Sequence, residues 1–363
     1  MVVDKFLPKK YTEKVTRGKV QHRAPSNIAL VKYWGKKDFQ LPANPSLSFT
    51  LTNSYTDTSV EFLPRTDFNA SFQIDFYFEE NPKEAFLTKI ETFFNRMRLY
   101  MPFLRDYHFV VRSHNSFPHS SGIASSASAM AALAVCLMKI EKLFCPEMTD
   151  EFFYEKASFL ARLGSGSACR SIIGSVVVWG EHPEIPNSSD LYGVPFGMTH
   201  EVFHRYQDTI LLIDKGQKQI SSTDGHDLMN NHPYAKQRFV QATENISKLN
   251  TILRVGALDD FVKLIESEAL TLHSMMMTSN PYFVLMRPNT LATIEQIWNF
   301  RRQTQIPVGF TLDAGANIHL LYPYQYKSEV QLLIESNLKN FCDNQQIIED
   351  EVPLESANFY PKF

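Results

Sequence analysis

The chain has 363 residues, which is long for one domain, and we expect two domains. Its hydrophobic fraction of 44% and aromatic fraction of 13% allow a sizeable core and exclude a disordered chain. The net charge of −3 gives no electrostatic basis for binding nucleic acid or an anionic membrane, so local groups would have to hold any anionic ligand. We see no secretion signal, membrane-spanning run or metal-ligand spacing, and expect a soluble cytoplasmic protein with reduced thiols at Cys136, Cys145, Cys169 and Cys342.

The first half of the chain contains predicted strands and helices in mixed order. Alternating apolar positions predict strands, and apolar residues at helical spacing predict amphipathic helices. We expect strands at 59–63, 72–78, 107–111 and 175–179, and helices at 83–97, 127–143 and 150–163. The segment 181–197 is rich in Pro, Gly and Ser, and it predicts a boundary between domains at 1–196 and 197–363.

The second half has the same character. Strands are predicted at 209–213, 308–312 and 317–322, and helices at 232–253, 258–278, 290–303 and 328–338. The acidic residues 349–351 are expected to belong to a solvated tail. Because strands and helices do not alternate strictly, the pattern predicts an α+β fold in both halves.

Residues 113–129 form a loop of small hydroxyl side chains around a single glycine, directly before an apolar helical run. A helix N-terminus offers unpaired N–H groups to an anion, and small residues let the anion approach the backbone. The loop therefore suggests a phosphate cradle. A serine-rich cap on a closely packed core helix explains it equally well, and the absence of Gly-Lys-Ser/Thr excludes a Walker A loop.

A second cluster lies at 24–38, where an apolar run ends in Lys-Tyr-Trp-Gly-Lys-Lys. This pattern predicts a buried strand that delivers Lys32 and Lys36 to the two sides of a glycine turn, where they can surround an anion. Solvated lysines at a strand end are the alternative, but they leave the adjacent Tyr33 and Trp34 unexplained.

Of two further clusters, one contains a cation and the other contains a carboxylate. In residues 162–171 a helix ends at Gly164, and Gly-Ser-Gly-Ser precedes Arg170, whose guanidinium suits a carboxylate or phosphate. A flexible linker is the alternative, which the apolar run after Arg170 disfavours. In residues 310–317 Asp313 follows an apolar strand and is a candidate general base or substrate-orienting group. An ordinary turn aspartate is the alternative.

Together these clusters resemble, in type and order, the diphosphomevalonate decarboxylase family of the GHMP kinase superfamily. The resemblance is carried by Ala-Pro-x-Asn-Ile-Ala-x-x-Lys-Tyr-Trp-Gly-Lys at 24–36 and by Gly-Ser-Gly-Ser-Ala-Cys-Arg-Ser at 164–171, with further matches at 41–48, 117–127 and 312–317. It implies a two-domain α+β GHMP kinase fold, with a ribosomal protein S5 domain 2-like N-terminal domain and a ferredoxin-like C-terminal domain.

The resemblance also implies an activity, namely ATP-dependent decarboxylation of mevalonate 5-diphosphate to isopentenyl diphosphate by way of phosphorylation of the 3-hydroxyl. Mg²⁺ would be held through the ATP phosphates, with Ser125 as a further contact, and relatives suggest a homodimer. A phosphomevalonate decarboxylase and a mevalonate 3-kinase are the nearest alternatives. A non-catalytic nucleotide-binding member is disfavoured because Lys32, Arg170 and Asp313 are all present.

Residue by residue, the resemblance implies three sets of contacts. Catalytic roles fall to Asp313, Lys32, Arg170 and Asn27. Substrate binding falls to Tyr33, Lys36, Ser165, Gly166, Ser167, Arg170 and Ser222. ATP binding falls to Asn115, Ser120, Ser121, Gly122, Ala124, Ser125 and Ser126.

Overall fold

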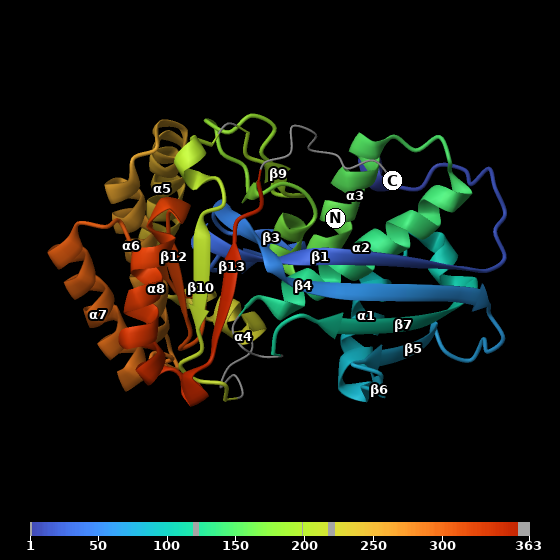
Figure 1. Cartoon of the computed structure of the whole chain (residues 1–363). Helices are drawn as coiled ribbons and strands as arrows, with labels where there is room; N and C mark the ends of the chain where they lie inside the picture. Colours follow the sequence, from blue (N-terminus) through green and yellow to red (C-terminus); the bar gives the residue numbers. More distant parts are fainter. Residues whose placement is uncertain (1, 119–122, 198, 217–221, 355–363) are drawn as a thin grey trace.

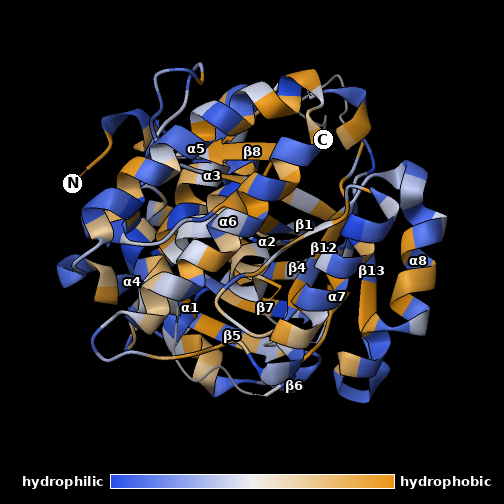
Figure 2. Ribbon diagram, turned by 90° about the vertical axis from the view of Figure 1, so that its left-hand side faces the viewer, coloured by the Kyte–Doolittle hydropathy of each residue, from blue (hydrophilic) through white to orange (hydrophobic). Residues whose placement is uncertain are grey.

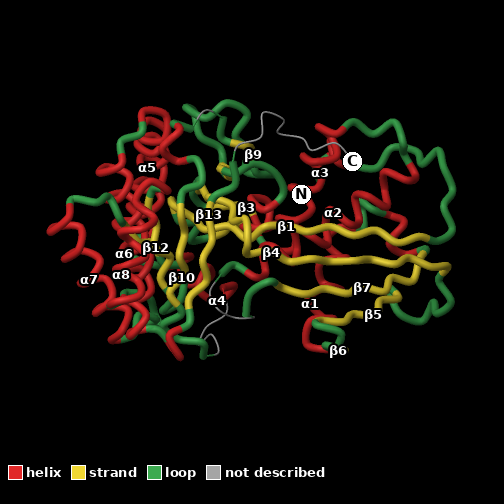
Figure 3. Tube along the Cα trace, in the orientation of Figure 1, coloured by secondary structure: helices red, strands yellow, loops and turns green. Residues whose placement is uncertain are grey.

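The computed structural model describes residues 2–118, 123–197, 199–216 and 222–354. It contains two large β-sheets with helices packed against each (Figure 1) and one small two-stranded sheet. The first sheet is formed by the N-terminal half of the chain and the second by the C-terminal half. Tracing the chain by secondary structure shows the long strands of the first sheet running toward the second (Figure 3). Within the described residues, no helix is both long and apolar enough to cross a membrane.

The first sheet has the order β6-β5-β7-β4-β8-β9, with β1 also paired to β4. Its longest strand, β4 (Ser46–Pro64), runs antiparallel to β1 (Gly18–Val31), β7 (Tyr107–Asn115) and β8 (Val176–Trp179). The other strands are β5 (Gln73–Phe78), β6 (Asn81–Pro82) and β9 (Val194–Pro195), and a separate short pair joins β2 (Lys36–Lys37) to β3 (Leu41–Pro42). The predicted strand 59–63 is therefore only the end of β4.

Helices α1 (Glu84–Met97), α2 (Ser125–Phe144) and α3 (Asp150–Gly164) accompany this sheet. Helix α2 contacts β1, β4 and α3, and its buried alanines (127, 131, 132 and 134) allow it to approach the strands closely. A 3₁₀ segment, Gly166–Ser171, follows α3 and packs against α2. This packing fixes the Gly-Ser-Gly-Ser segment beside the N-terminus of α2.

The second sheet has the order β11-β12-β10-β13. Its strands are β10 (Gln207–Leu211), β11 (Gly309–Thr311), β12 (Ile318–Tyr322) and β13 (Ile347–Glu351). Helices α5 (Ala235–Val255), α6 (Leu258–Met277), α7 (Pro288–Thr304) and α8 (Lys327–Ser336) gather on the side away from the first sheet (Figure 1), and the short α4 (Ser222–Asp227) lies between the two parts. The outer helices carry both hydrophilic and hydrophobic residues, whereas β8 is hydrophobic along most of its length (Figure 2).

The expected solvated tail at 349–351 is wrong, because these residues belong to β13, which pairs with β10. Asp350 is 3% exposed, and its carboxylate accepts backbone N–H groups of β4. Backbone N–H groups of the first sheet thus supply hydrogen-bond donors to the buried Asp350 carboxylate. The local sequence around an acidic run does not indicate that such donors are present.

A shared core joins the two sheets. Ile28, Leu30 and Phe49 from the first sheet cluster with Ile246 and Phe261 from α5 and α6, and all five are nearly inaccessible to solvent. The C-terminal end of β1 therefore lies within the C-terminal half of the molecule. This position brings the residues after Val31 close to those that follow β11.

Candidate active site

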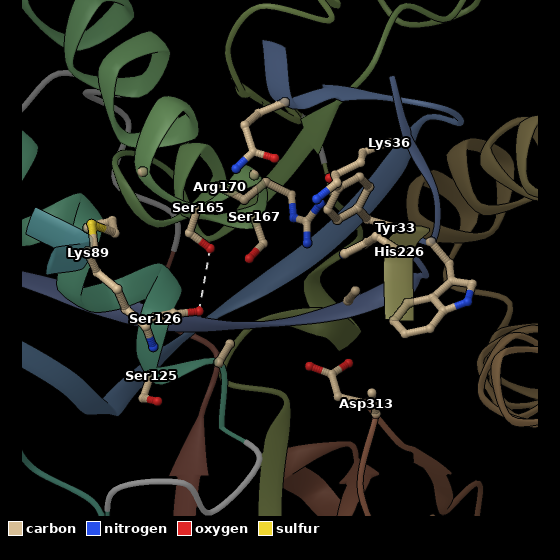
Figure 4. Close-up of a pocket in the computed structure, with 18 of the residues that line it drawn as sticks. Tyr33, Lys36, Lys89, Ser125, Ser126, Ser165, Ser167, Arg170, His226 and Asp313 are labelled. Atoms are coloured by element: carbon tan, nitrogen blue, oxygen red, sulfur yellow. Dashed lines mark hydrogen bonds between the residues drawn. The ribbon is translucent and has the colours of Figure 1, made fainter. Parts of the chain in front are cut away.

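A cavity of about 460 Å³ lies where the two halves meet. It is lined by the end of β1, one face of α1, the N-terminus of α2, the segment after α3, α4, and the turn after β11. Figure 4 shows Arg170 and Asp313 extending into it from opposite walls. Most of the residues singled out from the sequence line this one cavity: Lys32, Tyr33, Lys36, Ala124, Ser125, Ser126, Ser165, Gly166, Ser167, Arg170 and Asp313.

Lys32 and Asp313 form an ion pair at one wall of the cavity. Lys32 follows β1, Asp313 follows β11, and the Lys32 Nζ to Asp313 Oδ1 distance is 3.0 Å. The lysine side chain is 2% exposed and the aspartate side chain 32% exposed. Burial lowers the pKa of Lys32, while Asp313 and Glu268 oppose that shift. The Asp313 carboxylate is therefore paired with the Lys32 ammonium group and is still partly exposed at the cavity.

Arg170 presents a buried cation on the opposite wall. Its Nη1 donates to Ser46 Oγ at 2.5 Å, and its Nε donates to Asn27 Oδ1 at 3.4 Å. Asn27 is not among the lining residues, and its amide donates to Ser171 Oγ at 2.7 Å. It therefore orients Arg170 from the side away from the cavity. Within the described residues Arg170 makes no ion pair with a carboxylate, so its charge suits an anionic ligand.

Tyr33 and Lys36 lie beside the Gly-Ser-Gly-Ser segment. The Tyr33 ring packs against His226 at 4.2 Å between centroids, and burial raises its pKa. A Cβ atom at Gly166 would lie 2.9 Å from the Tyr33 hydroxyl oxygen, so the glycine permits this close approach. Lys36 Nζ lies 3.3 Å from an Asp227 oxygen of α4.

The N-terminus of α2 forms a third wall. Its N-cap residue is Ala124, in the left-handed region at φ +43°, and no side chain caps the helix in the described part of the chain. Ser125 and Ser126 line the cavity, and Ser126 Oγ lies 3.4 Å from Ser165 Oγ. An uncapped helix start with flanking hydroxyl groups suits the phosphates of ATP.

Some predicted residues are not brought to the cavity. Asn115 ends β7, accepts a hydrogen bond from Thr56 Oγ1 at 2.8 Å and is not among the described lining residues. Ser120, Ser121 and Gly122 lie outside the described residues. Ser222 begins α4, and only its backbone is described.

No group of three or more His, Cys, Asp or Glu side chains able to hold a metal ion occurs in the ranges that the structure covers. Among the described lining residues, the α2 N-terminus supplies hydroxyl groups and Asp313 is the only one with a carboxylate. These residues fit Mg²⁺ that is held mainly by nucleotide phosphates, with the hydroxyl groups of the α2 N-terminus as further contacts, because Mg²⁺ is commonly bound through substrate phosphates rather than by an all-protein cage.

Two family models match the chain. Residues 24–190 match the diphosphomevalonate decarboxylase-like N-terminal domain, and residues 209–359 match the mevalonate 5-diphosphate decarboxylase C-terminal domain. The chain belongs to the diphosphomevalonate decarboxylase family. The expected two-domain α+β fold of the GHMP kinase type is thereby confirmed.

Individual relatives agree with the family models. A diphosphomevalonate decarboxylase from Ganoderma lucidum is 28% identical over 332 residues, which cover 86% of this chain and 80% of the relative. The crystal structure of mevalonate diphosphate decarboxylase from Staphylococcus aureus is 28% identical, with a TM-score of 0.80 over 94% of this chain and 97% of the other. A solved complex of MDDEF with MVAPP, AMPPCP and magnesium is 26% identical, with a TM-score of 0.78 over 94% and 98%.

Several lining residues of this diphosphomevalonate decarboxylase family member were not singled out from the sequence. Lys89 and Arg96 of α1 add two cations to the cavity. Together with Thr92 and Phe93 they lie on one face of this helix, because they are three or four residues apart. His226 lines the cavity from α4. The helical spacing of these residues could have been recognised in the sequence. That this face of α1 lines the same cavity as Ser125 and Ser126 could not.

Proposed function

We propose that the chain catalyses the ATP-dependent decarboxylation of mevalonate 5-diphosphate to isopentenyl diphosphate, with ADP, phosphate and CO₂ as the other products. One observation carries the proposal: Lys32 and Asp313, 3.0 Å apart, share a cavity with the buried cation of Arg170. The activity named for the relatives and the MVAPP and AMPPCP of the related complex support the same reaction.

The chemistry requires a place for the electrons of the breaking C–C bond. No motif for a pyridoxal or thiamine electron sink was found in the sequence. ATP supplies a phosphoryl group that turns the tertiary 3-hydroxyl into a leaving group. When CO₂ departs, the C–C electron pair forms the new double bond and phosphate leaves with the electrons of the C–O bond.

The proposed role of each residue agrees with its position in the cavity. Asp313 contacts the 3-hydroxyl and orients it or accepts its proton, and Lys32 stabilises negative charge near the transferring phosphoryl group. Arg170, held by Asn27, binds the substrate carboxylate. The substrate diphosphate is bound by Tyr33, Lys36, Ser165, Gly166, Ser167 and Ser222.

ATP binding is proposed for the α2 side of the cavity. Ala124, Ser125 and Ser126 would lie at the phosphates, together with Ser120, Ser121 and Gly122, and Mg²⁺ would bridge the phosphates with Ser125 as a further contact. Lys89 and Arg96 add positive charge to the lining. Asn115 is also assigned to ATP binding, and Thr56 links it to Ser128 of α2.

We further propose a cytoplasmic homodimer that binds neither nucleic acid nor membranes, with domains at 1–196 and 197–363. The dimer follows from the family resemblance, and the boundary falls between the two family matches at 24–190 and 209–359. Size-exclusion chromatography with light scattering tests the dimer, and a mass of one chain contradicts it.

A substrate panel tests the reaction. Mevalonate, its 5-phosphate and its 5-diphosphate are each incubated with Mg-ATP, and CO₂ and ADP are measured. We expect both products in equal amounts from the diphosphate. CO₂ from the monophosphate alone would establish the phosphomevalonate decarboxylase, and ADP without CO₂ would establish a 3-kinase.

The variant Asp313→Asn tests the role of the carboxylate. We expect it to bind Mg-ATP with unchanged affinity and to turn over at least about a hundredfold more slowly, since it cannot accept a proton. Turnover within a fewfold of the wild type would remove Asp313 from its proposed role.

A further inference from the structure

His226 lies in the cavity wall and has no part in the roles assigned above. It belongs to α4, is 9% exposed, and its ring packs against Tyr33 at 4.2 Å and Trp34 at 4.9 Å between centroids. Its Nδ1 accepts the backbone N–H of Gly35 at 3.0 Å. The ring is thus held by contacts with three consecutive residues, 33–35.

These contacts fix the protonation of the ring. Nδ1 accepts a hydrogen bond and therefore carries no proton, so the proton of the neutral ring is on Nε2. Burial, together with the nearby charges of Lys36 and Arg170, lowers the pKa of His226 to about 3, and the ring is neutral at physiological pH. Within the described part of the chain, Nε2 has no hydrogen-bond acceptor.

We propose that His226 is a further substrate-binding residue whose Nε2–H donates a hydrogen bond to an oxygen of the substrate diphosphate. The inference rests on the proposed function, because its neighbours Tyr33 and Lys36 are the residues assigned to that diphosphate. The hydrogen bond adds to the affinity because the ring is already oriented before the ligand arrives.

A neutral donor suits this position. Lys36 and Arg170 already place two cations on this part of the lining, and Asp227 is ion-paired to Lys36. A third cation would be repelled by these two when no ligand is present. A neutral imidazole supplies a directed donor without that cost.

Two amide variants separate the two ring nitrogens. In His226→Asn the side-chain amide lies near the former Nδ1 and can still accept from Gly35, but no donor reaches the place of Nε2. In His226→Gln the longer side chain brings an amide donor near that place. Titration calorimetry without ATP measures the Kd of each protein for mevalonate 5-diphosphate and, separately, for Mg-ADP.

We expect His226→Asn to raise the Kd for mevalonate 5-diphosphate about tenfold and to leave the Kd for Mg-ADP unchanged, whereas His226→Gln stays within about threefold of the wild type. A purely structural role would instead shift both ligands together, in step with the melting temperature. Wild-type affinity of the Asn variant for the diphosphate, or equal loss in both variants, would overturn the inference.

The wild-type protein provides a second measurement that needs no folded variant. In ¹⁵N NMR of histidine-labelled protein, the Nε2 signal of His226 should move on addition of mevalonate 5-diphosphate and not on addition of Mg-ADP. No movement with the diphosphate overturns the inference. Release of CO₂ by the same wild-type sample tests the proposed function separately, so failure of one is distinguishable from failure of the other.

Discussion

At the scale of single residues, the cavity contains cations that the described protein groups do not neutralise. Arg170, Lys89 and Arg96 line it, and among the described residues none of the three makes an ion pair with a carboxylate. Arg170 is also nine-tenths or more buried. Keeping an uncompensated cation out of water is costly, so such a group stabilises the complex with an anion more than the empty protein.

Ser46 holds Arg170 in place. Its hydroxyl accepts from Arg170 Nη1 at 2.5 Å and donates to the Trp179 carbonyl at 3.3 Å. A hydrogen bond to a charged group contributes about 1.5–3 kcal/mol. We therefore expect Ser46→Ala to lower kcat/KM for mevalonate 5-diphosphate by about 10- to 100-fold, measured as CO₂ release.

Ser48 provides the matched control. It lies two residues further along β4, is also buried, and its hydroxyl has no hydrogen-bond partner among the described residues. Ser48→Ala should leave kcat/KM within about twofold of the wild type. Equal losses in the two variants would mean that a small change in β4 packing, rather than the contact with Arg170, causes the effect.

Motif residues and lining residues differed in how well they could be predicted. Lys32, Arg170 and Asp313 each stand at the end of a recognisable local pattern, and the structure brings them to one cavity as expected. His226 reaches the cavity, and Ser46 reaches Arg170, only through pairing and packing between distant segments. Nothing in their local sequence indicates which segments those are.

At the scale of elements, helix α6 fixes the end of strand β1. Glu268 Oε2 accepts the backbone N–H of Lys32 at 2.9 Å, and Arg238 of α5 donates to the Lys32 carbonyl at 3.3 Å. Arg238 and Glu268 are themselves ion-paired with side chains 1% and 0% exposed. The peptide groups around Lys32 are thus held by a buried pair from two helices.

Glu268→Gln tests this arrangement. The variant leaves Arg238 buried without its counter-charge, and breaking a buried pair costs about 3–5 kcal/mol, so the melting temperature should fall by several degrees. It also removes a negative charge that raises the pKa of Lys32. Lys32 would then lose its proton at a lower pH, and the alkaline decline of kcat/KM should move to lower pH.

Glu266 provides a control on the same helix. It is also buried, and the side chains that bind its carboxylate, Trp298 and Arg301, belong to α7. Glu266→Gln should lower the melting temperature and leave the alkaline decline unmoved. An identical pH profile for Glu268→Gln and the wild type would contradict a link between Glu268 and Lys32.

Elements were predictable where one periodicity dominates. The helices α2, α3 and α6 agree with the ranges predicted from the sequence to within two residues at every end, because their apolar faces are continuous. Most of β4 was missed, since it is flanked by strands on both sides and buries Ser48, Thr50, Ser54 and Thr56 among its apolar residues. A strand that is buried on both faces lacks the alternation of apolar and polar residues by which a half-buried strand is recognised.

At the scale of the whole molecule, Asp350 joins the two sheets. From β13 it accepts the backbone N–H groups of Thr52 and Asn53 at 2.9 and 2.8 Å on Oδ1, and that of Ser54 at 2.6 Å on Oδ2. The cavity takes Lys32 and Arg170 from the N-terminal half and Asp313 from the C-terminal half. The relative position of the halves therefore sets the distance across the cavity.

Asp350→Asn should weaken this connection while preserving the size of the side chain. One oxygen becomes an NH₂ group, which cannot accept, so at least one of these backbone N–H groups loses its partner. For the buried N–H of Ser54 the cost is about 1–3 kcal/mol. We expect a lower urea midpoint and a higher KM for both mevalonate 5-diphosphate and ATP. Glu349→Gln, at the exposed neighbouring side chain of β13, should change neither quantity. A lowered midpoint with both KM values unchanged would show that Asp350 stabilises the fold without setting the geometry of the cavity.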